Sequence, residues 1–178
     1  MQPMFETLLR LLSETSSGPA VTTDDSILLI YPPDKELDFC EQLIDQFLPA
    51  AQARGLPIQP LDLTGFGFDC LSDDEVESLS EDEFEDYRWA RQSLAQRLEQ
   101  SLHARLEDLA QDRPGCVVVA HATVALYPLV RFGDVLKDLR SLQSRIVLAF
   151  PGAERGGRLH FMSQSDGSNY LAVKLFWQ

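Results

Sequence analysis

Three short and almost wholly apolar runs constrain the fold of this chain most. They are Ser26–Tyr31, Cys116–Ala120 and Arg145–Phe150. Each run is too short for a buried helix, and the first and last end abruptly at Pro32-Pro33 and Pro151-Gly152, as expected of strands buried on both faces. Longer segments with apolar residues at helical spacing lie between them. This alternation predicts a mostly parallel sheet with helices on both faces.

The helical spacing of apolar residues predicts four helices. They cover residues 4–12, 40–51, 84–109 and 129–142. Ile58–Leu63 is a further expected strand, and Pro60 inside it lacks an amide donor, which places that strand at a sheet edge. The tail predicts an antiparallel hairpin in which residues 159–163 pair with residues 170–176 around a turn at Asp166-Gly167.

Length and composition predict one domain. The chain has 178 residues, of which 44% are hydrophobic and 24% charged, as in ordinary globular proteins. We therefore expect a single three-layer α/β domain over residues 1–178, with a mostly parallel sheet, helices on both faces and a C-terminal antiparallel hairpin. Within it, residues 1–25 form an N-terminal helix and loop, and residues 72–86 form an acidic segment.

The acidity of the chain is local. Its net charge is −13, from 28 acidic residues against 15 Lys and Arg, and nine of the acids lie in residues 72–86 with no base among them. Without those nine, 19 acids face 15 bases. Because nucleic acids and anionic membranes attract cations, this composition argues against direct binding to either.

The acidic segment has three interpretations. It is a solvated loop whose acids favour the N-terminus of the following helix. Alternatively, Glu81, Asp82, Glu83 and Glu85 form a docking strip for a basic partner, with binding that weakens in salt. A third interpretation is DNA mimicry, which requires acids spread over an extended face rather than confined to one run.

Three further residues are candidates for partner binding. Arg155 and Arg158 flank Gly156-Gly157, which predicts a basic loop that either binds an anion or an acidic partner or is a solvated turn. Trp177 is hard to bury so near the last residue, and aromatic residues are favoured interface anchors. For Trp89 we expect packing in the core.

The sequence carries no recognisable catalytic machinery. The loop after the first strand has no glycine for binding phosphate, and no Gly-Lys pair occurs. The spacing of the three cysteines fits neither zinc nor disulfides, and the histidines lack metal-ligand spacing. His121 follows a buried strand, where catalytic side chains often lie, but has no nucleophile motif nearby. We therefore expect no catalytic, cofactor-binding or metal site and no enzyme activity.

The location of the chain follows from what its sequence lacks. No basic signal-peptide start is present, and no run approaches the roughly 20 apolar residues that span a bilayer. We expect a cytoplasmic protein.

An ordered set of motifs in the second half of the chain carries a family resemblance. These motifs are Cys116-Val-Val-Val-Ala-His, Arg131-Phe-Gly-Asp-Val-Leu-Lys, Arg145-Ile-Val-Leu-Ala-Phe-Pro-Gly and Asp166-Gly-Ser-Asn-Tyr-Leu-Ala-Val. The set resembles the BrxB family of bacterial BREX phage-defence systems, whose members look like small α/β proteins. The resemblance implies a non-enzymatic role in a multi-protein complex, in which the chain helps to assemble a PglZ-like phosphatase-domain protein with a BrxC-like ATPase.

The sequence thus predicts a non-catalytic adaptor that acts through protein–protein interaction and requires no cofactor. The alternative is a degenerate nucleotide-binding or hydrolytic α/β domain that uses the crevice near Pro32-Pro33, His121 and Arg155.

Overall fold

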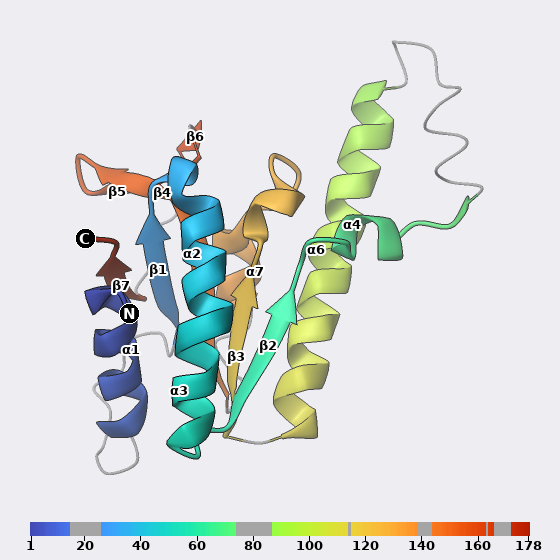
Figure 1. Ribbon diagram of the computed structural model, residues 1–178. Coiled ribbons are helices and arrows are strands. Elements are labelled where there is room, and N and C mark those ends of the chain that lie inside the picture. Colours follow the sequence, from blue (N-terminus) through green and yellow to red (C-terminus); the bar gives the residue numbers. More distant parts are fainter. Residues whose placement is uncertain (15–25, 74–86, 114, 139–143, 163, 166–171) are drawn as a thin grey trace.

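The computed structural model describes residues 1–178 except 15–25, 74–86, 114, 139–143, 163 and 166–171 (Figure 1). The helices are α1 (Pro3–Glu14), η1 (Pro33–Lys35), α2 (Glu36–Gln42), η2 (Leu43–Phe47), α3 (Leu48–Ala53), α4 (Phe66–Asp69), α6 (Tyr87–Asp112), η3 (Thr123–Leu126) and α7 (Phe132–Asp138). The strands are β1 (Ile27–Tyr31), β2 (Ile58–Asp62), β3 (Val117–His121), β4 (Arg145–Arg155), β5 (Arg158–Phe161), β6 (Gln164–Ser165) and β7 (Val173–Phe176).

The main sheet is parallel throughout, in the order β2-β3-β4-β1-β7. The two completely buried strands, β1 and β3, each have neighbours on both sides. This confirms the prediction drawn from their apolar runs. β2 lies at the edge of the described sheet and pairs with β3, so Pro60 has no second neighbouring strand to which it would have to donate a hydrogen bond. This edge position confirms the prediction.

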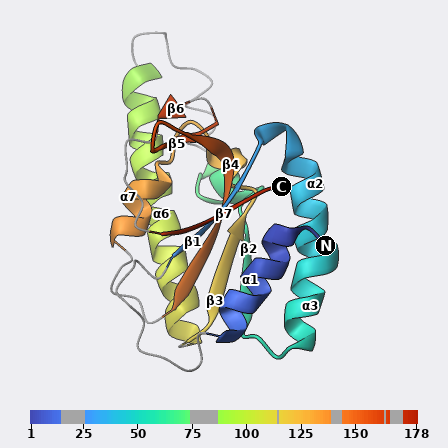
Figure 2. The ribbon, with the colours of Figure 1, turned by 90° about the vertical axis from the view of Figure 1, so that its left-hand side faces the viewer.

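Helices cover the sheet on both faces, which confirms the predicted three-layer α/β architecture. Figures 1 and 2 show α1, α2 and α3 on one face and α6 and α7 on the other. Because side chains alternate along a strand, β1 contributes to both cores. Leu28 and Ile30 pack in the core under α6 and α7, whereas Ile27, Leu29 and Tyr31 pack under α1, α2 and α3.

The predicted helices are found with altered bounds. Residues 40–51 fall within a continuous helical segment, α2-η2-α3, in which η2 is a single π-helical turn. The long helix α6 has Leu98, Leu102 and Leu106 on its buried side, as its spacing predicts. The expected start at residue 84 and the expected end of α7 at residue 142 lie outside the described residues.

The prediction that a strand stops at Pro151-Gly152 is wrong. β4 continues to Arg155, because Pro151 needs no amide donor here and its carbonyl accepts a hydrogen bond from the Met162 amide at 2.7 Å. Gly152 permits the close approach of β5, since a Cβ at this position would overlap the carbonyl oxygen of His160. Beyond the sheet, β4 therefore becomes one arm of a hairpin.

The antiparallel hairpin near the C-terminus exists, but its strands are not the predicted ones. β5 pairs with β4 and with β6 instead of with residues 170–176. The two residues of its turn, Gly156 and Gly157, have φ angles of 57° and 74°, which suit a tight hairpin. β7 instead pairs in parallel with β1, because its apolar residues extend the sheet beside the most buried strand. The expected turn at 166–167 lies outside the described residues.

Candidate functional site

Polar side chains gather where β1, β2 and β3 end. Tyr31, Asp62 and His121 are the last residues of these three parallel strands, whose arrowheads point to the same edge in Figure 1. Helix α2 begins at this edge and brings Glu36 and Cys40. Ligands of open α/β sheets bind at the carboxyl ends of strands. This cluster is therefore the first place to look for chemistry, and we call Tyr31, Glu36, Cys40, Asp62 and His121 the strand-end cluster.

Glu36 connects two members of the strand-end cluster. The Tyr31 hydroxyl donates to Glu36 Oε2 at 2.7 Å, and the Cys40 thiol lies 3.5 Å from Glu36 Oε1. The Tyr31 ring stacks on Phe39, with centroids 3.9 Å apart. Burial, together with the Glu36 carboxylate, raises the pKa of Tyr31 and raises that of Cys40 to about 12. Both groups stay protonated at neutral pH, so Cys40 lacks the thiolate that a nucleophile requires.

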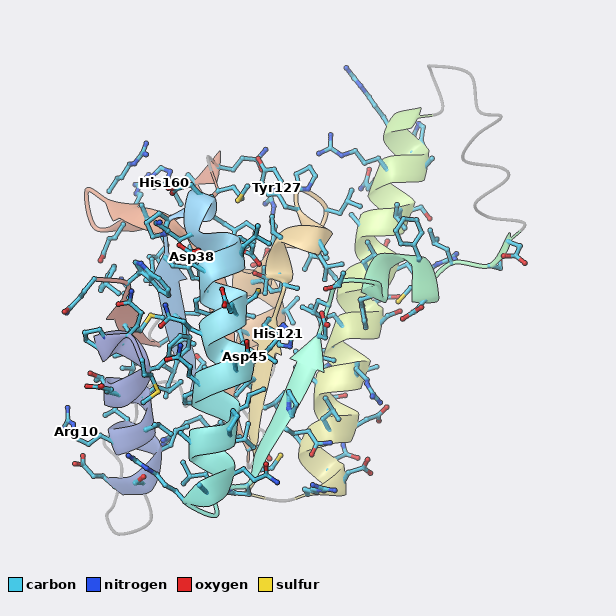
Figure 3. The ribbon with its side chains drawn as sticks, in the orientation of Figure 1. Arg10, Asp38, Asp45, His121, Tyr127 and His160 are labelled. Atoms are coloured by element: carbon cyan, nitrogen blue, oxygen red, sulfur yellow. The ribbon has the colours of Figure 1, made fainter. Side chains whose placement is uncertain are left out.

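His121 is buried beside an exposed carboxylate. Its Nδ1 lies 4.0 Å from Asp62 Oδ1, and its side chain is 7% exposed against 60% for Asp62. Figure 3 labels His121 at the end of β3. Burial lowers the pKa of His121 and outweighs the opposing effects of Asp62 and Glu36. The imidazole is therefore mainly neutral at neutral pH.

Asp62 is held in a local turn. Its Oδ1 accepts hydrogen bonds from the Thr64 amide at 2.9 Å and the Thr64 hydroxyl at 2.6 Å. Partial burial works to raise the pKa of Asp62, but these two bonds and His121 together lower it. The carboxylate remains charged and is aimed by the chain that follows β2.

The loop after β3 lies at the same edge of the sheet as the strand-end cluster. Ala122 adopts a left-handed φ of 55°, and the buried Thr123 hydroxyl donates to the Ala149 carbonyl at 2.8 Å. The strand-end cluster thus combines carboxylates on Glu36 and Asp62 with protonated Tyr31 and Cys40 and a mainly neutral His121, and it presents no thiolate nucleophile. In the part of the chain that the structure describes, no group of three or more His, Cys, Asp or Glu is arranged to hold a metal ion.

Of the sequence-predicted binding residues, Arg155 and Arg158 lie away from this cluster. Glu81, Asp82, Glu83 and Glu85 lie outside the described residues. Arg155 and Arg158 are exposed and face each other across the β4–β5 turn. Because β4 pairs with β1 only as far as Pro151, the hairpin carries Arg155 about 13 Å farther along the strand. The basic loop is therefore the tip of an ordered hairpin.

Of the two tryptophans, Trp177 is the more buried. Trp177 is partly buried, with its ring 6.2 Å from that of Phe39 and its amide bonded to the Ile30 carbonyl at 2.8 Å. Trp89 is 74% exposed, so the expectation that it packs in the core is wrong. It lies in the first turn of α6, which Figure 1 shows extending beyond the ends of β1, β2 and β3. These three strands therefore do not cover this turn of α6.

Sequence reasoning missed most of the strand-end cluster because it examined His121 without its partners. Two local patterns would have pointed to them. Glu36 and Cys40 are four residues apart on one helix, which puts them on one face. Asp62 and Thr64 form the Asp-x-Thr pattern of an Asx turn directly after a strand.

Comparison with known proteins identifies a family. The family model described as BREX protein BrxB matches residues 61–175, about two thirds of the chain. Neither the curated proteins nor the solved structures contain a match. As for membranes, no described helix has both the length and the apolar character that a transmembrane span requires.

Proposed function

Because the chain belongs to the BrxB family of BREX proteins, we propose that it is a non-catalytic adaptor that assembles other components of its system. Membership makes it a component of a BREX defence system. The adaptor role is a more specific proposal than family membership, and its support is the exposed apolar side chains of the chain. In this proposal the work is done by side chains that contact other proteins, and the strand-end cluster stabilises the fold.

Three exposed large apolar side chains carry the proposal. Leu37 in α2, Phe68 in α4 and Trp89 in α6 are 83%, 77% and 74% exposed. Single exposed leucines are ordinary on protein surfaces. A tryptophan with three quarters of its surface in water is not, since Trp is buried on average and is enriched among residues that dominate binding energy. We infer that Trp89 is the anchor.

The partners that we propose are other BREX proteins, namely the PglZ-like phosphatase-domain protein and the BrxC-like ATPase. Trp89 follows the acidic segment by three residues in the sequence. An aromatic anchor beside a run of acids suits a partner surface with an apolar pocket and a basic rim. The proposed roles of Glu81, Asp82, Glu83 and Glu85 belong to this same docking region.

The test is affinity purification of the tagged chain from its host at low and moderate salt, with identification of the proteins that accompany it. We expect the phosphatase-domain protein or the ATPase. Trp89→Ala should reduce their recovery at least tenfold, since hot-spot truncation costs about 2 kcal/mol or more. Gln92→Ala, also exposed on α6, is the matched control and should change nothing.

Two results would contradict the adaptor proposal. One is a chain that purifies alone at both salt concentrations. The other is equal recovery of partners by Trp89→Ala and by wild type, which would remove Trp89 as the anchor. If salt lowers the recovery of partners by wild type but not by a variant that lacks the acidic side chains, the acidic strip contributes as well. The side chains to replace are those of Glu81, Asp82, Glu83 and Glu85.

A second candidate function, the degenerate ligand-binding domain, is favoured by one observation. The strand-end cluster lies where α/β domains bind ligands and has a neutral His121 near a charged Asp62. A thermal-shift screen with nucleotides tests it. A ligand present at 100 times its dissociation constant adds about 2.7 kcal/mol to the unfolding free energy, a readily measured shift for a chain of this size. His121→Asn should abolish such a shift.

A further inference from the structure

A small pocket opens where three separate parts of the chain meet. Its volume is about 140 Å³. α6 contributes Arg91, the segment between η3 and α7 contributes Tyr127 and Arg131, and β6 contributes Gln164 and Ser165. Figure 3 labels Tyr127 near the same edge of the molecule as the β4–β5 hairpin. We call this space the two-arginine pocket.

The floor of the two-arginine pocket is a packed aromatic group. Phe161 is 5% exposed, and its ring lies 5.3 Å from that of Phe132, 6.0 Å from that of Tyr127 and 5.1 Å from that of Phe150. These ring contacts hold the apolar floor of the pocket in place. β6 is held by its pairing with β5, in which Gln164 lies opposite Phe161.

The charge of this pocket is opposite to that of the whole chain. Two arginines, Arg91 and Arg131, line it, and none of the described lining residues is acidic. The net charge of the chain is −13. A neighbouring pocket of about 360 Å³ between α6 and α7 is different, because Glu99 and Asp134 line it. The cationic lining of the smaller pocket is therefore a local feature.

The backbone around Arg131 is tied to α6. Its amide donates to Glu99 Oε1 at 3.2 Å, and its carbonyl accepts from the Asp134 amide at 3.0 Å. Because the Glu99 carboxylate bonds to the backbone, it fixes the loop on α6 without occupying the pocket lining. Arg91 from α6 and Arg131 from the loop before α7 thus line the same pocket, and the hydrogen bond to Glu99 holds the loop against α6.

We propose that the two-arginine pocket binds the phosphate group of a small molecule. Guanidinium groups present planar, paired donors that match phosphate oxygens, and the Gln164 amide and Ser165 hydroxyl add neutral donors. The volume holds about five water molecules at liquid density, which suits a phosphate group and is too small for a whole nucleotide. The Tyr127 and Phe161 rings face the organic part. Trp89, the proposed anchor of the adaptor, does not line this pocket.

Isothermal titration of the full chain with inorganic phosphate tests the proposal, followed by titration with glycerol phosphate and with acetate. We expect both phosphates to bind, glycerol phosphate the more tightly, and acetate to bind at least tenfold more weakly. Arg91→Gln and Arg131→Gln should each raise the dissociation constant for phosphate at least tenfold. Arg88→Gln removes an exposed arginine of α6 that does not line the pocket, and it should leave the constant unchanged.

Several outcomes would overturn the proposal. They are no heat of binding at millimolar phosphate, equal affinity for acetate and phosphate, and equal weakening by Arg88→Gln. Unfolding curves show whether each variant is folded, and if either pocket variant unfolds, Ser165→Ala replaces it with an expected smaller loss of affinity. Recovery of BREX partners by the Arg131→Gln variant separates the two proposals, because an adaptor without a phosphate site still recovers them.

Discussion

The two halves of α6 differ in what lies beneath them. From about the middle of the helix to its C-terminal end, Leu98, Leu102, Leu106 and Leu109 are buried against the sheet. In the first half, Trp89 is exposed and Arg91 lines the two-arginine pocket. Both halves are regular helix of one continuous element. The comparison shows that a helical apolar pattern predicts which side of a helix is apolar, while the extent of the neighbouring layer decides how much of that side is buried.

The cause is a difference in length. The 26 residues of α6 span about 39 Å, whereas the five residues of β3 span about 17 Å. One end of the helix must therefore project beyond the strand. Figure 1 shows that it is the N-terminal end, on the side where the strands terminate. The overhang lies beside the loops at which α/β proteins form their binding sites.

The strongest test of this comparison is one truncation in each half of α6. Leu102→Ala should lower the free energy of unfolding by about 2–5 kcal/mol, because Leu102 is 1% exposed and its loss leaves a cavity. Trp89→Ala should change it by less than about 0.5 kcal/mol, as for other exposed residues. Urea denaturation measures both. A loss above about 1 kcal/mol for Trp89→Ala would show that the overhang is packed.

A second test compares two glycines, one packed and one open. Gly152→Ala should destabilise by about 1–3 kcal/mol, because the new methyl group meets the His160 backbone where β4 leaves the main sheet. Gly67→Ala, in α4, meets nothing within 4 Å and should be neutral or slightly stabilising. Thermal unfolding of both variants provides the measurement. Equal shifts in the midpoint would mean that β4 does not approach β5 at Gly152 as closely as described.

A third test asks whether tight packing continues to the ends of the strands. Tyr31→Phe removes the hydroxyl that donates to Glu36 while keeping the ring stacked on Phe39. We expect a loss of about 1–2 kcal/mol, since the acceptor is a carboxylate. Chemical denaturation at pH 7 measures it. The same substitution made in a Glu36→Gln background should cost less, and an equal cost would show that the hydrogen bond contributes nothing.

The smallest expected effect is a pH dependence. Burial makes the pKa of His121 lower in the folded chain than its usual value of 6.5. As pH falls below about 6.5, the unfolded chain binds the proton first, so this contribution favours unfolding, and it becomes constant below the folded pKa. Above pH 6.5 the contribution is absent. His121→Asn should therefore lose less stability than wild type between pH 7.5 and pH 5.5, and parallel curves would contradict the burial of a neutral imidazole.

Sequence patterns predicted the parts of the fold that depend on side-chain periodicity. The two-sided runs of β1 and β3, the edge position of β2 and the leucine face of α6 all follow from which residues avoid water. Pairing partners did not follow, because any apolar strand can extend the sheet. Val173–Phe176 therefore joined β1 instead of forming the expected hairpin. Pro151-Gly152 looked like a strand end because its hydrogen bonding with β5 depends on residues farther along the chain.

The candidate sites were less predictable for the same reason. His121 was noticed from its place after a strand, but its relation to Asp62 arises from the adjacency of β2 and β3. Arg91 and Arg131 are 40 residues apart in the sequence, and only the packing of α6 beside the loop before α7 brings them to one pocket. Neither juxtaposition leaves a local pattern that a reading of the sequence detects.

The position of β7 also has a consequence for the order of folding during synthesis. β1 is made early, yet one of its two neighbours is β4 and the other is β7, whose residues are translated more than 140 positions later. Until residue 176 has left the ribosome, one edge of β1 has no strand to pair with, and an unpaired apolar edge is prone to intermolecular association. The nascent chain should therefore depend on chaperones for longer than its modest length suggests.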